Sequence, residues 1–422
     1  MKFEITNIDG TRWMYDNLTN RAVSLDTGLS LSQKLKELKL SQPLRYESCS
    51  FDMDDCSAIH KDKTISKLRI QLGLNCNYKC SFCLQRTLAH LVPTAKEADI
   101  DEFFKKLDRA GIVIKDDANI QLWGGEPLVY IKLLKILVPK LRKRYPNADI
   151  STISNGTLLT REIADFLIEY RVSLTFSHDA QAYFLRGKDP LTDPEMRALW
   201  RETIQRYREN NLRFGINTVI SQYNADLFEI QNFFEDRLGP DVGFGFEGVV
   251  VAHTPNAHSF TLFGEPERRA LQKSIYRALI AEPESKVGQA LSKYAMWIFK
   301  SFAYEVPMMT IKSRCDVLNP NTLGVDLFGN IMSCHNVSAA QQCCGKLDDF
   351  DKAKYKFFTH WSRRKACSNC IALVSCKGNC PRDNNLEHSL SCDAQKMFHV
   401  MLFRCAWAMM TGSFIKEFNY IH

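Results

Sequence analysis

Several features of membrane and secreted proteins are missing from this sequence. No run of apolar residues approaches the ~18 that a membrane-spanning helix needs, and the N-terminus, MKFEITNIDG, lacks the pattern of a signal peptide. A strong charge bias is missing too, since 55 lysines and arginines stand against 48 acidic residues, a formal net charge of +7. We therefore expect a cytoplasmic protein with no membrane partner, and so mild a basic excess gives no reason to predict a nucleic-acid partner.

The cysteine content indicates bound metal. The chain has 15 cysteines in 422 residues, and the reducing compartment expected for it disfavours disulfides. Three of them lie between Cys76 and Cys83, and ten of the other twelve lie between Cys315 and Cys405. We therefore expect metal ligands in two separate parts of the chain.

The length predicts two or three domains, with boundaries near residues 64 and 285. Residues 1–64 contain short strands and a helix at 30–40, which predicts a small α+β unit. This unit can be a cap on the next domain or a peptide-docking edge. Residues 65–285 alternate strands with helices, and residues 286–422 hold a linking helix and the second group of cysteines.

Six strand–helix pairs are expected within residues 65–285. Strands that alternate with helices form parallel sheets with right-handed crossovers, so the fold class is α/β. The expected strands are 68–74, 119–125, 149–156, 172–179, 212–220 and 242–251, and the expected helices are 95–110, 130–144, 160–170, 194–210, 225–238 and 266–281.

The first of these strands leads into a loop with three closely spaced cysteines. Cys76, Cys80 and Cys83 have the spacing C-x3-C-x2-C. Three thiolates on one loop can hold three irons of a cubane cluster and leave the fourth iron open. The alternative is part of a zinc site, but zinc sites favour C-x2-C pairs closed by a nearby fourth ligand. The next candidate ligands here are the distant His90 and Cys315.

This loop resembles that of the radical S-adenosylmethionine (SAM) enzymes, C-x3-C-x-aromatic-C, with Phe82 as the aromatic residue. The resemblance implies a 4Fe-4S cluster on the three cysteines, with SAM chelated at the open iron. It implies cleavage of SAM to a 5′-deoxyadenosyl radical, with electrons from a flavodoxin- or ferredoxin-type reductant. It also implies that the strand–helix pairs form a partial (β/α)6 TIM-like barrel with functional residues at the carboxyl ends of its strands.

Later strand ends match further motifs of that family. Residues 124–127 read GGEP, the turn that receives the amino group of SAM, and residues 154–156 read SNG, similar to the turn near its methionyl and ribose parts. The resemblance implies that SAM binds at Phe82, Gly124, Gly125, Glu126, Pro127, Ser154, Asn155, Ser177 and Thr218.

The fourth strand ends in Ser177-His178-Asp179, where many relatives have S-x-D-G, and Ala180 replaces that glycine. An Arg-Gly pair follows at 186–187, as a related pair does in the peptide-modifying branch of the family. The resemblance implies that Asp179 and His178 are the candidate catalytic residues, with His178 as a proton donor or acceptor. A His178 that points away from the barrel is the alternative.

The second group of cysteines resembles the SPASM domain, and the resemblance implies two auxiliary 4Fe-4S clusters in addition to the SAM-binding one. A pair of structural zinc sites is the alternative on spacing alone. The family pattern assigns Cys315, Cys334 and Cys380 to an inner cluster, with Cys343 or Cys344 as the candidate fourth ligand or an open iron, and Cys367, Cys370, Cys376 and Cys392 to an outer cluster.

Auxiliary clusters favour an oxidative reaction on a peptide. If the carbon radical left by hydrogen abstraction attacks another side chain or loses a proton to form a double bond, one further electron must leave, and the clusters offer a route for it. The segments HWSRR at 360–364 and SHDA at 177–180 resemble maturases of ribosomally made peptides, including those that form carbon–carbon cyclophane links. We expect such an enzyme, with a precursor peptide as its partner. The alternatives are a formylglycine-generating sulfatase maturase and a non-catalytic iron–sulfur or zinc protein.

Overall fold

The computed structural model describes residues 1–37, 61–87, 93–251, 259–261, 263–311, 315–316, 319–334, 336–354, 360–380 and 385–421, without the side chains of 363 and 385–391. Cys49 and Cys56, which we expect to be thiols of a linker rather than metal ligands, and the end of the predicted helix beyond residue 37 lie outside these ranges.

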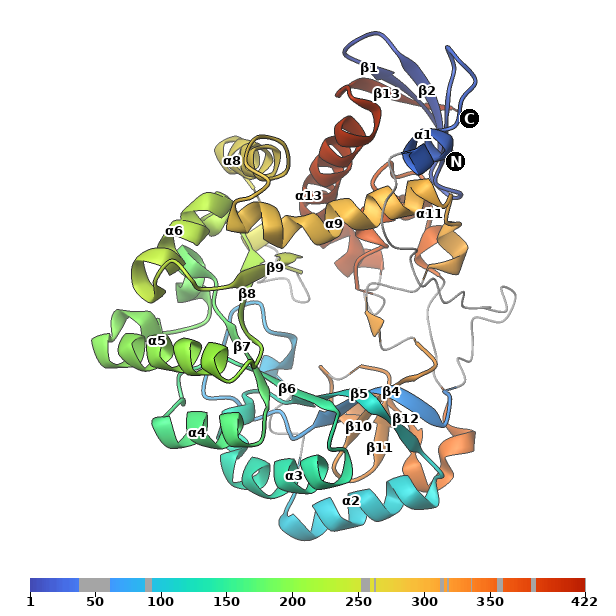
Figure 1. The fold of residues 1–422 in the computed structure, drawn as a ribbon. Helices are drawn as coiled ribbons and strands as arrows, with labels where there is room; N and C mark the ends of the chain where they lie inside the picture. Colours follow the sequence, from blue (N-terminus) through green and yellow to red (C-terminus); the bar gives the residue numbers. More distant parts are fainter. Residues whose placement is uncertain are drawn as a thin grey trace.

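A curved sheet of nine strands forms the centre of the molecule, in the order β12-β11-β10-β4-β5-β6-β7-β8-β9. Strands β4 to β9 are parallel to their neighbours, and helices α2 to α6 lie along the outer side of the curve (Figure 1). The predicted α/β class with six parallel strands is therefore confirmed. The strands are β4 (Thr64–Gln71), β5 (Val113–Trp123), β6 (Asp149–Ser154), β7 (Ser173–Ser177), β8 (Phe214–Ile220) and β9 (Phe244–Val249), and the helices are α2 (Glu97–Arg109), α3 (Ile131–Arg144), α4 (Arg161–Glu169), α5 (Pro194–Glu209) and α6 (Leu227–Leu238).

The helices pack on the sheet through apolar stripes at helical spacing. In α2 the buried residues are Ile100, Phe103, Phe104 and Leu107, which recur every three or four positions and so share one face. The first strand differs from its predicted position, since β4 begins at Thr64 and ends at Gln71, before the glycine at position 73. Residues 72–75 therefore connect β4 to the cysteine loop outside the strand.

The cysteine-rich part of the chain extends the same sheet. β10 (Thr322–Asp326) pairs in parallel with β4, and β11 (Asn330–Met332) and β12 (Cys343–Lys346) continue antiparallel from it. Asp316, just before β10, forms ion pairs with Lys67 and Arg69 of β4 at 3.1 and 2.7 Å. These contacts attach the region after Cys315 to the strand that leads into the cysteine loop.

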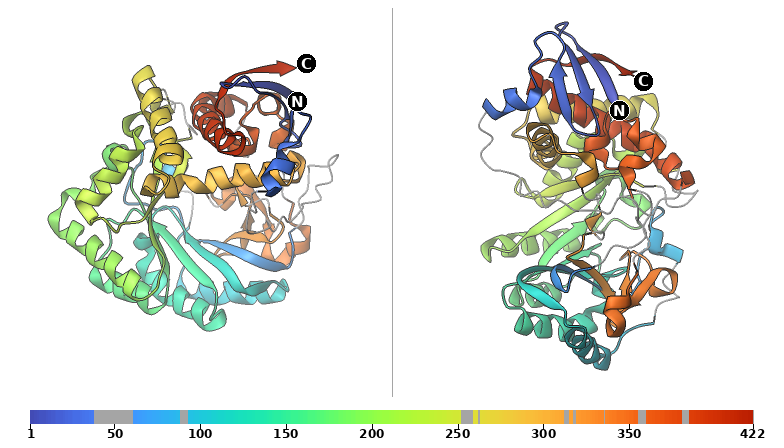
Figure 2. Two further views of the ribbon diagram at one scale, coloured as in Figure 1. Left: turned by 45° about the horizontal axis from the view of Figure 1, so that its top comes forward. Right: turned by 90° about the vertical axis from the view of Figure 1, so that its right-hand side faces the viewer.

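The N-terminal strands form a second sheet with the end of the chain. Its order is β13-β1-β2-β3, and Figure 2 shows the two termini close together. The indole N–H of Trp407 donates to Asn7 at 2.9 Å, and the ring of Tyr15 packs on Phe302 and Phe403. The strands are β1 (Lys2–Asn7), β2 (Arg12–Asp16), β3 (Arg21–Ser24) and β13 (Ile415–Ile421), and the nearby helices are α1 (Leu31–Glu37), α8 (Glu265–Tyr276), α9 (Lys286–Ala303) and α13 (Asn385–Thr411).

Both predicted domain boundaries are crossed by these sheets, and the division into three units stays a prediction. The strand β13 was not predicted from the sequence. No helix in the described ranges combines the length and the apolarity that crossing a membrane requires.

Candidate functional site

Glycines bring the exits of β4 and β5 into direct backbone contact. The N–H of Gly125 donates to the Gly73 carbonyl at 3.1 Å, and a Cβ on Gly125 would lie 2.4 Å from the carbonyl oxygens of Leu74 and Asn75. The hydroxyl of Tyr130 accepts from the Asn75 N–H at 2.7 Å. The GGEP turn therefore lies against the backbone that leads into the cysteine loop, and only glycine fits there.

The Glu126 carboxylate joins this turn to the SNG turn after β6. It accepts hydrogen bonds from the Ser154 hydroxyl and the Asn155 N–H, both at 2.7 Å, and from the Leu128 N–H at 2.9 Å. Burial raises the pKa of Glu126, and these hydrogen bonds act in the opposite direction. Its oxygens are thus used within the protein, and SAM binding by its side chain stays a prediction.

The SNG turn in turn holds the cysteine loop. The Asn155 side-chain amide donates to Asn77 at 2.9 Å, and Asn77 donates to the Thr157 hydroxyl at 2.8 Å. Gly156 has φ +74°, and a Cβ there would lie 2.3 Å from the Trp200 ring. The position next to Cys76 is therefore fixed by side-chain hydrogen bonds from the turn after β6.

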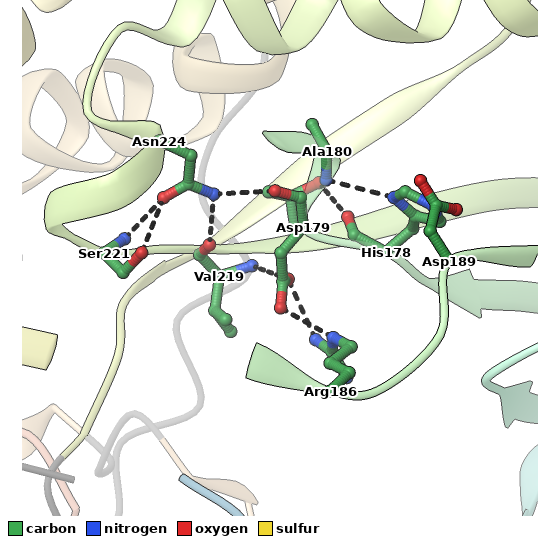
Figure 3. Close-up of polar contacts among 9 residues, drawn as sticks. His178, Asp179, Ala180, Arg186, Asp189, Val219, Ser221 and Asn224 are labelled. Carbon is green, nitrogen blue, oxygen red and sulfur yellow. Dashed lines mark hydrogen bonds and ion pairs between the residues drawn. The ribbon is translucent and has the colours of Figure 1, made fainter. Parts of the chain in front are cut away.

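A buried ion pair follows the end of β7 (Figure 3). The Arg186 Nε and one terminal nitrogen donate to the two Asp179 carboxylate oxygens at 2.6 and 2.9 Å. The Val219 N–H donates to the same carboxylate at 3.0 Å, and the Asn224 amide donates to the Asp179 carbonyl at 3.1 Å. Asp179 is thus anchored to β8, and a catalytic role for it stays a prediction.

His178 lies on the other side of this turn, away from Arg186 (Figure 3). It is fully buried; its Nδ1 accepts the Ala180 N–H at 3.0 Å, and its Nε2 lies 2.9 Å from the Asp189 carboxylate. Burial lowers the pKa of His178, so the ring is neutral with its proton on Nε2. These are the contacts of a structural residue. They match the alternative in which His178 points away, and its predicted proton-transfer role stays a prediction.

Ala180 has a left-handed backbone, with φ +50°. Its side chain therefore costs about 1 kcal/mol relative to the glycine of the family motif. The bond from its N–H to His178 helps to hold this conformation. The hydroxyl of Thr218 donates to the His178 carbonyl at 2.8 Å, so it also serves this turn, and Ser177 is half-buried at the strand end.

The cysteine loop docks on the 3-10 helix η4 (Ala180–Leu185). The Ser81 N–H donates to the Leu185 carbonyl at 2.8 Å, and the Tyr78 hydroxyl donates to the Lys188 carbonyl. The Cys76 thiol lies near enough to the other two thiols of the loop for them to raise its pKa. Burial raises the pKa of the Cys80 thiol to about 11, against the effect of the Arg186 cation.

The C-terminal cysteines are only partly gathered. Cys367, Cys370 and Cys392 lie near enough to affect one another's pKa, while Cys405 is buried in the core. Within the described parts of the chain, no group of three or more His, Cys, Asp or Glu side chains is arranged to hold a metal ion. None of the described cysteines forms a disulfide, so their sulfur donors suit iron–sulfur clusters, but the predicted ligand sets stay predictions.

Three residues of this network were not predicted. Tyr130 lies directly before α3, and nothing in the neighbouring sequence indicates a contact with Asn75. Asn77 lies between the first two cysteines, and its polar side chain was a signal that could have been used. Asn224 follows β8 and donates to the Val219 carbonyl at 3.0 Å and to the Asp179 carbonyl, and the second contact joins segments 45 residues apart, which spacing cannot reveal.

A model of the radical SAM superfamily matches residues 70–230. This stretch contains the cysteine loop, the GGEP and SNG turns and the ion pair after β7. Residues 70–230 form a radical SAM domain. The remaining cysteine-rich region lies outside the matched stretch.

Two curated relatives are named for different reactions. The radical SAM cyclopropyl synthase TigE of Paramaledivibacter caminithermalis is 23% identical over 207 residues, which cover 44% of this chain and 42% of TigE. The GTP 3′,8-cyclase of Clostridium perfringens is 28% identical over 182 residues, 39% of this chain and 51% of that protein. The chain thus spans about half or less of these relatives.

Among solved structures, native anSMEcpe with bound AdoMet and Cp18Cys peptide has the same fold. The TM-score is 0.56 at 16% identity, and the match covers 83% of this chain and 99% of that chain. The likeness therefore extends beyond residues 70–230 into the C-terminal region, and it concerns the fold.

Gly125→Ala should destabilise the protein by about 1–3 kcal/mol, because the new Cβ meets two backbone carbonyls that cannot move independently. Gly215→Ala in β8 is the matched control, since a Cβ there meets no atom within 4 Å. Anaerobic urea unfolding followed by circular dichroism measures both. Equal midpoints for the two variants would contradict the close contact between the strand exits.

Proposed function

We propose that this protein is a radical SAM peptide maturase that removes a side-chain hydrogen from a ribosomally made precursor peptide and oxidises it to a carbon–carbon cyclophane link. One observation supports this most: the cysteine loop is joined to the SNG turn, packed on the GGEP turn and docked on the segment after β7. Three motifs that are far apart in sequence thus form one site at the carboxyl ends of the strands.

The residues at this site suit the cofactors that such a reaction needs. Cys76, Cys80 and Cys83 would hold the SAM-binding cluster, which with SAM supplies a 5′-deoxyadenosyl radical. The backbone at Gly124 and Gly125 is open to a ligand because neither residue has a side chain. The proposed electron source is a flavodoxin- or ferredoxin-type reductant.

Two comparisons support the choice of substrate and product. The anSMEcpe structure holds a peptide together with AdoMet, and its fold covers most of this chain. TigE is a cyclopropyl synthase, and closing a cyclopropyl ring makes a carbon–carbon bond. The formylglycine alternative stays a candidate, since the fold shared with anSMEcpe suits it equally.

The auxiliary clusters are part of the proposal. We assign the outer one to Cys367, Cys370, Cys376 and Cys392, three of which already lie within electrostatic range of one another. They would accept the electron that leaves the peptide after hydrogen abstraction.

Cys344 is the better candidate for the fourth ligand of the inner cluster, beside Cys315, Cys334 and Cys380. Its half-buried thiol is hydrogen-bonded to Ser333, the residue before Cys334. Cys344 and Cys315 are also both near the Lys61 amine, whose pKa burial lowers to about 7 and the two cysteines raise. The neighbouring thiol of Cys343 is exposed and donates to the Gly345 carbonyl at 3.1 Å.

Cys344→Ala should leave the inner cluster with three thiolates, while Cys343→Ala, the matched control, should leave it intact. Both are made in a Cys76/Cys80/Cys83→Ala background, which retains only the auxiliary clusters and about 8 irons. After oxidation, electron paramagnetic resonance (EPR) should show a 3Fe-4S signal in Cys344→Ala alone. The same signal in Cys343→Ala, or in neither variant, would contradict this assignment.

The modified peptide should be about 2 Da lighter per link, because one hydrogen atom goes to the adenosyl radical and one proton and one electron leave separately. Mass spectrometry of a co-expressed precursor peptide should show this loss together with a ring that resists fragmentation. A product that reacts with hydrazine and has no linked aromatic residue would instead favour formylglycine formation.

A further inference from the structure

Arg186 is a buried cation between the end of β7 and the cysteine loop. Its side chain is 12% exposed, and that of its partner Asp179 is 1% exposed. Two parallel N–H···O bonds, at 2.6 and 2.9 Å, fix both the position and the plane of the guanidinium group. Since the Val219 N–H also holds Asp179, the pair is anchored to β8 and cannot shift freely.

The free face of the same guanidinium is turned to the cysteine loop. Its central carbon lies 5.2 Å from the centroid of the Phe82 ring, a cation–π contact with the residue next to Cys83. The member of the pair that contacts the loop is therefore the positively charged one.

The segment that carries Arg186 is short and hydrogen-bonded at both ends. The Arg186 N–H donates to the Tyr183 carbonyl at 2.8 Å, and the Leu185 carbonyl accepts the Ser81 N–H at 2.8 Å. The left-handed Ala180 begins the same segment. The distance between Arg186 and the loop is thus set by backbone contacts on both sides.

We propose that Arg186 is a positioning residue that holds Cys80 and Phe82 in place and makes the SAM-binding cluster easier to reduce. This rests on the proposed function, because it takes Cys80 as a cluster ligand. A cluster gains negative charge on reduction, so a fixed cation beside one of its thiolates stabilises the reduced state. Asp179 orients the cation and offsets part of its charge.

The test is a redox titration of the full-length, anaerobically reconstituted protein, followed by EPR. The SAM-binding cluster is recognised by the change of its signal when SAM is added, and the auxiliary clusters serve as internal references. Arg186→Gln should lower the ratio of reduced to oxidised SAM-binding cluster about tenfold at a fixed potential, equivalent to 59 mV for one electron. Arg186→Lys, which keeps the charge, should recover most of that loss.

The Asp179→Asn variant distinguishes an effect of charge on the cluster from an effect of a loosened cysteine loop. Removing the carboxylate charge should shift the ratio in the opposite direction, toward the reduced cluster, whereas a merely structural role predicts the same direction for both variants. The Asp179→Asn variant also tests the proposal if Arg186→Gln fails to assemble the SAM-binding cluster. Arg161→Gln is the matched control, because Arg161 is 77% exposed and should change nothing.

Two results would overturn the inference. One is an unchanged ratio in Arg186→Gln with its SAM-binding cluster assembled, and the other is an Asp179→Asn shift toward the oxidised cluster. If the proposed function itself fails, the wild-type protein will already lack a signal that responds to SAM. The two failures can therefore be told apart on the unmodified protein.

Discussion

The buried Glu126 carboxylate is the contact on which the site depends. It accepts one hydrogen bond from its own turn and two from Ser154 and Asn155, so it joins the ends of β5 and β6. Because it is buried, losing these donors would leave a charge unpaired, which costs more than the bonds themselves contribute. Asn155 then reaches Asn77 in the cysteine loop. The Glu126 carboxylate thus helps to position the cysteine loop through Asn155.

A second constraint connects the loop to the cysteine-rich region. β4 ends just before the loop, and on its other edge it pairs with β10 of the C-terminal region. The ion pairs of Asp316 with Lys67 and Arg69 strengthen this attachment next to Cys315. Since the cysteine loop follows β4 and Asp316, next to Cys315, is paired to the same strand, the sheet sets the separation of Cys315 from the loop. A fixed separation is what electron transfer between the proposed clusters would require.

Much of the barrel could be predicted from the sequence, because strand and helix periods are local and the motifs fall at strand ends. Other features depend on partners far away in the chain. β13 pairs with β1 across about the whole chain length, which no periodicity encodes. The residues of S-H-D-A were found, but their directions were not, since His178 is buried by Tyr183 and Phe233, from segments outside the motif. Spacing in the sequence cannot distinguish Cys343 from Cys344 as a ligand, because they are adjacent. Their burial differs in the structure, where Cys343 is exposed and Cys344 is half-buried.

The central claim is that the loop of Cys76, Cys80 and Cys83 cleaves SAM reductively. The most direct measurement is chromatography of 5′-deoxyadenosine after anaerobic incubation of the reconstituted protein with SAM and dithionite. The wild-type protein should form 5′-deoxyadenosine, and a variant with all three cysteines changed to alanine should form none. A wild-type protein that assembles its iron–sulfur clusters and still leaves SAM intact would contradict the claim.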